Sequence, residues 1–293
     1  MDTELQRPLA HASFTRRRLF GALAATTVAP ALLAACGGSE SAESVEYTLV
    51  TRFPGSVLAP GQVRMPYQLS LGAANIISDG PDTLGAQLTD IDGRLIGDKF
   101  TASKRQVDPF PYYDFRVQID EPGLYNIIVD NGPESGASIQ ILPAEAIPVP
   151  SAGMALPPFD TPTFANEQGF EAICSRTPEP CRFHDISLTD ALATGKPVAY
   201  YVGTPAFCST GSCGPALDSL ITAAEEFGDR VEFVHAEVYS DTAGTVVTDA
   251  VGAVGMFYEP ALFVTNANGV ITERLDAIWG LDEVNEVLSR AVA

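Results

Sequence analysis

The chain has 293 residues, and its 37 acidic side chains against 17 basic ones give a formal net charge of −20. A surface this acidic repels nucleic-acid phosphates and anionic lipid headgroups, so the composition excludes nucleic-acid binding as the function. The length is sufficient for two ordinary domains.

Residues 1–35 have the pattern of an export signal. Three arginines, Arg16–Arg18, precede a short apolar stretch of small residues, and residues 15–20 resemble the twin-arginine motif. Residues 33–36, Leu-Ala-Ala-Cys, resemble a bacterial lipobox, which implies that Cys36 is lipidated. Residues 36–45 are small and polar, as in a flexible tether. We predict a lipoprotein anchored on the outer side of a bacterial cytoplasmic membrane, with an uncleaved signal anchor as the alternative.

Residues 46–142 have the alternation of β-strands. Apolar Phe115, Val117 and Ile119 alternate with polar neighbours, and Asp92-Gly93 is a strong hairpin signal. The stretch "PGLYNIIV" resembles a strand of bacterial immunoglobulin-like modules. The pattern predicts an all-β immunoglobulin-like sandwich. No cluster of catalytic residue types stands out in it, which favours a spacer or docking module.

Six prolines between residues 143 and 165 predict a semi-rigid linker and a domain boundary. Residues 166–293 then change to alternating strands and helices. An apolar run, Val198–Val202, predicts a strand buried on both faces, and residues 217–227 have helical spacing that ends at Gly228. The predicted order in this α/β domain is β-α-β-α-β-β-α.

The second domain resembles the thioredoxin family. A cysteine motif follows the first strand, Pro260 opens a later strand in "FYEPALFV", an N-x-x-G turn joins the final hairpin, and Gly280 precedes the last helix. The resemblance implies that Cys208 and Cys213 exchange disulfides with thiols of exported proteins. It also implies that Pro260 shapes the substrate groove and that Phe207 covers the sulfurs. The motif departs from the family, because four residues separate the cysteines.

The cysteines form two close pairs, which favours two disulfides in an exported chain. A thiol at a helix N-terminus has a lowered pKa, so Cys213 is expected to be the more nucleophilic of its pair, with Cys208 as its partner. A structural disulfide without turnover is the alternative for this pair. Cys174 and Cys181 enclose a proline-containing turn and are predicted to form a structural disulfide.

Two other functions remain open. Copper-delivery proteins of the Sco type share the fold, and Cys208, Cys213 and His235 are the copper ligands in that alternative, although neither His184 nor His235 lies in a motif of that family. The second open function is a membrane-anchored, non-catalytic scaffold with structural disulfides. We expect no cofactor, and the sequence offers no recognised hydrolase motif and no recognised zinc-ligand spacing.

Overall fold

The computed structural model describes residues 46–72 and 75–293. The predicted export signal, Cys36 and the tether up to residue 45 lie outside the described residues. Within the described ranges, no helix is both long and apolar enough to cross a bilayer.

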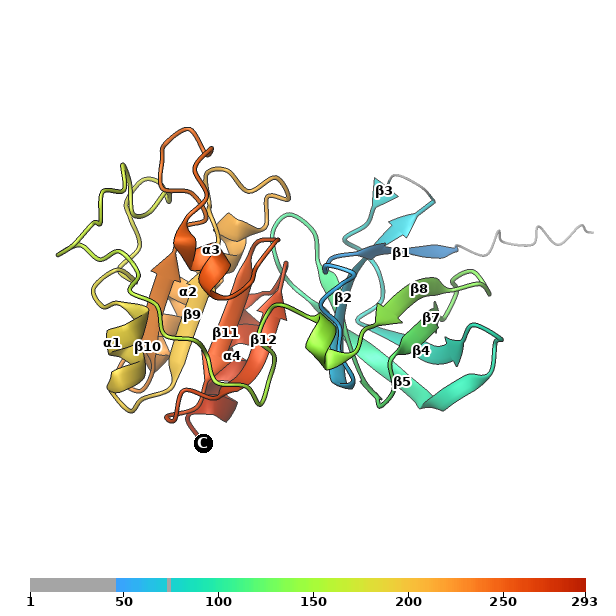
Figure 1. Ribbon diagram of the computed structural model, residues 1–293. Helices are drawn as coiled ribbons and strands as arrows, with labels where there is room; N and C mark the ends of the chain where they lie inside the picture. The colour runs from blue at the N-terminus through green and yellow to red at the C-terminus, as the bar shows by residue number, and fades with distance from the viewer. Residues whose placement is uncertain (1–45, 73–74) are drawn as a thin grey trace, which may run out of the picture. The chain divides into compact units, whose positions relative to one another are not determined.

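Eight antiparallel strands form the first sheet (Figure 1). Their bounds are β1 Tyr47–Thr51, β2 Gly61–Leu71, β3 Asn75–Ile76, β4 Thr83–Asp90, β5 Leu95–Arg105, β6 Tyr112–Ile119, β7 Gly123–Val129 and β8 Ala137–Ile141. The strand order is β1-β2-β6-β5-β4-β7-β8, and β3 pairs with β2. The turn between β4 and β5 lies at Asp92-Gly93 as predicted, with Gly93 at φ 80°.

The strand β5 makes this a single sheet. It pairs with β4 along most of its length, whereas only Lys104 and Arg105 at its end pair with β6. Alternate side chains of β2, β4, β6, β7 and β8 meet in one apolar core. The all-β character therefore agrees with the prediction. The immunoglobulin-like arrangement is not confirmed, because β5 joins the two halves into one curved sheet.

The second sheet has four strands in the order β10-β9-β11-β12 (Figure 1). The elements after the 3-10 turn η1 (Ala144–Ala146) are α1 Leu188–Ala193, β9 Val198–Val202, α2 Cys213–Phe227, β10 Glu232–Ala236, α3 Asp249–Ala253, β11 Ala261–Thr265, β12 Ile271–Asp276 and α4 Leu281–Ala291. β9 and β10 are parallel, and β11 is antiparallel to both of its neighbours. The order from β9 to α4 is the predicted β-α-β-α-β-β-α order of a thioredoxin-like fold.

Both faces of this sheet are covered, as the apolar run of β9 predicts. Ala199 and Tyr201 pack into the core that α2 and α4 share. Val198, Tyr200 and Val202 point to the opposite face, where α1 and α3 pack. The two-residue period of a strand thus explains why every residue of β9 is buried.

The predicted proline-rich linker is well ordered against the second sheet. Gly153 donates its backbone N–H to the carbonyl of Ile271 over 2.8 Å, and Leu156 donates to Gly269 over 2.9 Å. The side chains of Val149 and Leu156 are buried in the core beside α1. Residues 153–156 of the linker, which include no proline, therefore lie along the start of β12 and the turn before it. The division of the chain into domains stays a prediction.

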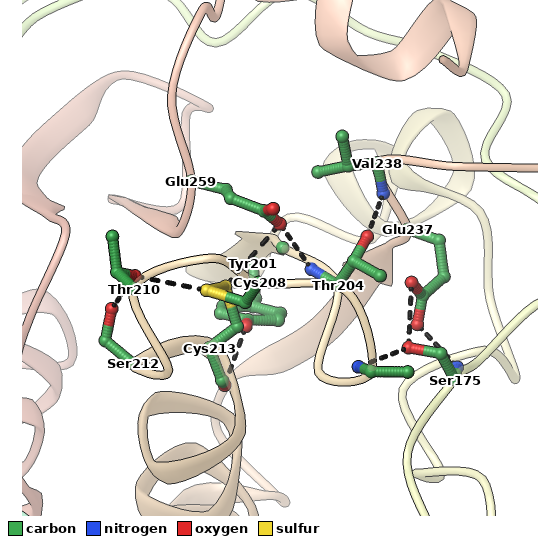
Figure 2. Close-up of a disulfide and its surroundings, with 12 residues drawn as sticks. Ser175, Tyr201, Thr204, Cys208, Thr210, Ser212, Cys213, Glu237, Val238 and Glu259 are labelled. Atoms are coloured by element: carbon green, nitrogen blue, oxygen red, sulfur yellow. Dashed lines mark hydrogen bonds between the residues drawn. A yellow bond between two sulfur atoms is a disulfide. The ribbon is translucent and has the colours of Figure 1, made fainter. Parts of the chain in front are cut away.

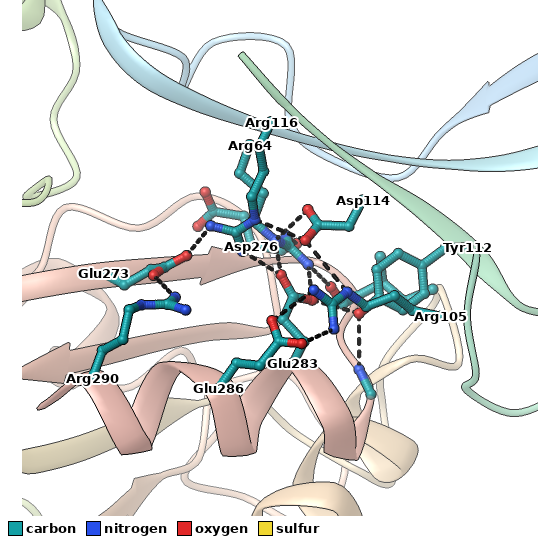
Figure 3. A network of polar contacts seen from close by, with 12 residues as sticks. Arg64, Arg105, Tyr112, Asp114, Arg116, Glu273, Asp276, Glu283, Glu286 and Arg290 are labelled. Carbon is teal, nitrogen blue, oxygen red and sulfur yellow. Dashed lines mark hydrogen bonds and ion pairs between the residues drawn. The ribbon is translucent and has the colours of Figure 1, made fainter. Parts of the chain in front are cut away.

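A buried polar network surrounds Glu283 in the first turn of α4 (Figure 3). Arg64 of β2 donates to both carboxylate oxygens, over 2.6 and 2.7 Å. Arg116 of β6 donates to the same carboxylate over 2.6 Å, and the Tyr112 hydroxyl also donates to it. Burial by itself would raise the pKa of Glu283, but the charge and hydrogen bonds of Arg64 outweigh it and lower that pKa to about 2.

Candidate functional site

Cys208 and Cys213 form a disulfide beside the N-terminus of α2 (Figure 2). Cys208 lies in the loop that follows β9, and Cys213 is the first residue of α2. Their Cα atoms are 5.9 Å apart, within the range that disulfides span. Tyr201 donates its hydroxyl hydrogen to the carbonyl of Cys213 over 2.9 Å, which ties the helix start to β9. The predicted pairing of these two cysteines is therefore present.

The two sulfurs differ in accessibility. Cys213 is completely buried, whereas Cys208 is half-buried in a loop whose neighbours Phe207, Ser209 and Thr210 are exposed. A thiolate from another protein can therefore reach the sulfur of Cys208, whereas the burial of Cys213 keeps that thiolate from its sulfur. Its position at the start of a helix predicts that Cys213 is the more reactive thiol. The structure favours Cys208 for the first attack, because burial at the helix start closes Cys213 off.

Glu259 supplies a carboxylate beside the buried sulfur. Its Oε2 lies 3.5 Å from Cys213 Sγ and accepts a hydrogen bond from the backbone N–H of Thr204 over 2.7 Å (Figure 2). Burial raises the pKa of Glu259, and the nearby charge of Glu237 adds to the increase. A carboxyl with a raised pKa next to a thiol can exchange a proton with it when the disulfide opens.

Pro260 follows Glu259 through a cis peptide bond, at the position that the family resemblance implies. It lies close to Gly203 at the end of β9, where an added Cβ would collide with Pro260 and with the ring of Tyr201. Phe207 is 38% exposed and packs edge-on against Tyr239, with ring centroids 6.1 Å apart. The roles of Pro260 in a substrate groove and of Phe207 as a cover stay predictions.

Cys174 and Cys181 are not joined by a disulfide; both are free and buried. This corrects the expectation of a structural disulfide. Both sulfurs face Nδ1 of His235, at 3.8 Å from Cys174 and 3.3 Å from Cys181. Nε2 of His184 lies 3.1 Å from the same nitrogen. The two thiols and the two imidazoles thus form one buried cluster.

The copper alternative built on Cys208, Cys213 and His235 is wrong in its ligand set. His235 belongs to the cluster with Cys174, Cys181 and His184. Among the described residues, Glu259 is the further potential ligand grouped with Cys208 and Cys213. Strand β10 holds His235 beside Tyr201, with their ring centroids 5.0 Å apart.

A short loop separates the two cysteine clusters. Thr204 in this loop donates its N–H to Glu259, and its hydroxyl accepts from Val238 over 2.8 Å. Ala206 donates its N–H to the hydroxyl of Ser175, the residue after Cys174, over 3.1 Å. Ser175 in turn donates to the carboxylate of Glu237 (Figure 2). The loop that carries Cys208 is therefore held between Glu259 on one side and the Cys174 segment on the other.

Sequence reasoning overlooked two features. Glu259 stands out in the apolar stretch "MFYEPALFV", and a lone carboxylate before the strand-opening proline was the available signal. The second feature is the run Cys174-x6-Cys181-x2-His184, which brings three potential metal ligands close together in sequence. His235, 51 residues beyond His184, joins them only through the fold.

No protein-family model matches the chain, and no curated protein matches it. Several solved structures are similar to it, among them these two. One is dsbF of MTB, 16% identical, covering 47% of this chain and 98% of its own, with a TM-score of 0.32. The other is a thioredoxin-family thiol:disulfide interchange protein from Chlorobium tepidum TLS, 12% identical, covering 49% and 99%, with a TM-score of 0.33. With similarity this low, any function of this chain has to be inferred from its own site.

Proposed function

We propose that the protein exchanges disulfides with thiols of exported proteins, through Cys208 and Cys213, while its lipid anchor holds it outside the bacterial cytoplasmic membrane. The observation that carries the proposal is the disulfide at the start of α2, with one sulfur accessible and the other buried. A purely structural disulfide needs no such asymmetry.

The exchange proceeds in two balanced steps. A partner thiolate attacks Sγ of Cys208, which forms a mixed disulfide and releases Cys213 as a thiolate that takes up one proton. A second thiolate of the partner then attacks the partner's own sulfur in the mixed disulfide and releases Cys208. The partner gains a disulfide and loses two electrons, and the pair Cys208 and Cys213 is reduced. The same steps run in reverse when the reduced pair meets a partner disulfide.

The helix start and Glu259 have separate tasks in these steps. The unpaired N–H groups of the first turn of α2 stabilise the thiolate that leaves at Cys213. Glu259, 3.5 Å from that sulfur, is placed to give or take the proton of the buried thiol. The exposed loop around Cys208 leaves its sulfur free for the partner.

The test replaces both cysteines by serine. We expect the Cys208→Ser/Cys213→Ser variant to lose exchange with a reduced or disulfide-bonded model protein, in assays that run in both directions. The reduction potential of the wild-type pair should lie at or above about −270 mV, where exchangeable pairs are found. Undiminished exchange in the double variant, or a potential well below about −300 mV, would leave only a structural disulfide.

A second prediction concerns Glu259. When the reduced pair meets a partner disulfide, we expect Glu259→Gln to slow the attack of Cys213 on the mixed disulfide by about 10²-fold, the usual effect of losing a positioned acid or base, while the first attack by Cys208 on the partner keeps its rate. Rapid-quench alkylation followed by mass spectrometry separates the two steps. Asp218→Asn is the matched control, because this carboxylate lies exposed on α2. Equal rates for both variants would remove Glu259 from the mechanism.

A further inference from the structure

The cluster of Cys174, Cys181, His184 and His235 lies apart from the disulfide and takes no part in exchange. One potential ligand atom from each residue lies within 4.8 Å of every other, and all four residues are buried. We propose that this cluster is a metal site that binds one Zn²⁺ ion through two cysteine sulfurs and two histidine nitrogens.

The distances between the donor atoms fit a tetrahedral zinc ion. Zinc bonds of about 2.3 Å to sulfur and 2.0–2.1 Å to nitrogen place two nitrogens about 3.3 Å apart, and a nitrogen and a sulfur about 3.5 Å apart. Nε2 of His184 is 3.1 Å from Nδ1 of His235. The same nitrogen lies 3.3 Å from Cys181 Sγ and 3.8 Å from Cys174 Sγ. The distances from Nδ1 of His235 to the other three donors thus match those in a tetrahedral zinc site, and the remaining donor pairs lie within 4.8 Å.

The hydrogen bonds of His235 turn a lone pair toward the cluster. Its Nε2 lies 2.9 Å from the carbonyl oxygen of Gly203, which can only accept, so Nε2 carries the hydrogen. In the neutral imidazole, Nδ1 is then unprotonated, and it faces the other three ligands. This pairing of a ligand histidine with a backbone carbonyl is the usual support of a metal-bound imidazole. Glu237, with Oε1 3.7 Å from Nε2, reinforces the orientation.

A bound cation would also account for the close contact between His184 and His235. Nδ1 of His184 is buried and has no hydrogen-bond partner among the described residues. If that nitrogen carries the hydrogen, the Nε2 lone pair of His184 opposes the Nδ1 lone pair of His235 at 3.1 Å. A cation between the two nitrogens turns this repulsion into two bonds. Without a cation, His184 can donate to His235 only by leaving its own Nδ1 as a bare buried acceptor.

The backbone holds the ligands in place from several elements. His235 is part of β10, and its N–H donates to the carbonyl of Phe183 over 3.0 Å, which fixes the segment carrying Cys181 and His184. The Cys181 N–H points at Cys174 Sγ over 3.3 Å. Ser175 donates its N–H to Glu237 over 2.6 Å, which fixes the residue next to Cys174. Such anchoring lowers the cost of assembling four ligands around an ion.

Charge and chemistry select zinc. Two thiolates neutralise one divalent cation, so the loaded site is uncharged and can be buried without an unpaired charge. Two sulfurs and two imidazole nitrogens complete a tetrahedral shell with no open position, which is the composition of a structural zinc site. Hard cations such as Mg²⁺ and Ca²⁺ prefer oxygen ligands and do not suit this set.

The test is metal analysis of the full chain purified without chelators. We expect one zinc per chain, and, after stripping, uptake of one Co²⁺ with the sulfur-to-metal absorption of a tetrahedral thiolate site. His184→Ala should lose most of the bound zinc, whereas His184→Cys, which restores a four-ligand set, should retain it. In the wild type, Cys174 and Cys181 should react with a thiol reagent only after chelation.

The Cys208→Ser/Cys213→Ser variant is the matched control. It should keep one zinc per chain although it has no exchange activity, so failure of the metal proposal and failure of the exchange proposal can be told apart. Three results would overturn the metal site: a Cys174–Cys181 disulfide in peptide maps of the protein as purified without chelators, uptake of Cu⁺ with no uptake of Zn²⁺, or zinc that depends on Cys208 and Cys213.

Discussion

Replacing Glu283 by alanine should lower the free energy of unfolding by about 3–5 kcal/mol, the usual cost of breaking a buried ion pair from one side. The carboxylate is fully buried and accepts hydrogen bonds from Arg64, Arg116 and Tyr112. Without it, the guanidinium of Arg64, whose side chain is 9% exposed, stays buried without its main counter-charge. Chemical denaturation can be followed by the fluorescence of Trp279, the single tryptophan of the chain. Trp279 is buried and lies three residues beyond the end of β12.

The control for this prediction lies on the same helix. Glu286 pairs with Arg105 over 2.7 Å, but its side chain is 51% exposed. Exposed pairs contribute about 0–1 kcal/mol, so Glu286→Ala should change the unfolding free energy little. Equal losses in the two variants would mean that the network around Glu283 has no special weight in the stability of the protein.

The pH dependence of the unfolding free energy is a second measurement of the same ion pair. The pKa of Glu283 is lowered from 4.5 to about 2, so its contribution to stability is complete above pH 4.5 and is lost as the pH falls toward 2. Asp114, whose pKa is raised mainly by burial, acts with the opposite sign. Comparing the wild type with Glu283→Gln isolates the part due to Glu283: the difference in stability should shrink as the pH falls through this window.

The fold of the second half could be predicted because its signals are local. The apolar run of β9 and the helical spacing of α2 report burial directly, and a strand, a connecting helix and a parallel strand follow from them. The curved sheet of the first half could not be predicted to the same depth. Period two identifies strands, but which strands pair is decided by contacts such as that between Arg105 and Tyr112, which no local pattern reports.

Buried charged residues show most clearly what local sequence patterns cannot predict. Glu283 lies in "LDEVNEVLSRAV", an amphipathic pattern in which a glutamate is expected to face water. It is buried because Arg64, 219 residues earlier in the chain, reaches it. The cysteines show the same limit. Counting and spacing favour a disulfide between Cys174 and Cys181, while the two histidines that change their chemistry are brought to them by the fold.

Trapping experiments on single variants should show which sulfur meets the partner. In reduced Cys213→Ser, the thiolate of Cys208 attacks a partner disulfide, forms a mixed disulfide and releases one partner thiolate; no second thiol is present to resolve it, so it accumulates. In Cys208→Ser, the remaining thiol is the fully buried Cys213, and little mixed disulfide should form. Gel analysis after acid quenching, with and without reductant, measures both. The unpaired N–H groups at the start of α2 stabilise a thiolate at Cys213 whether or not a partner can reach it, so the two variants compare thiolate stability with accessibility. Trapping through Cys208 means that access decides, and trapping through Cys213 would require the 204–212 loop to open before exchange begins.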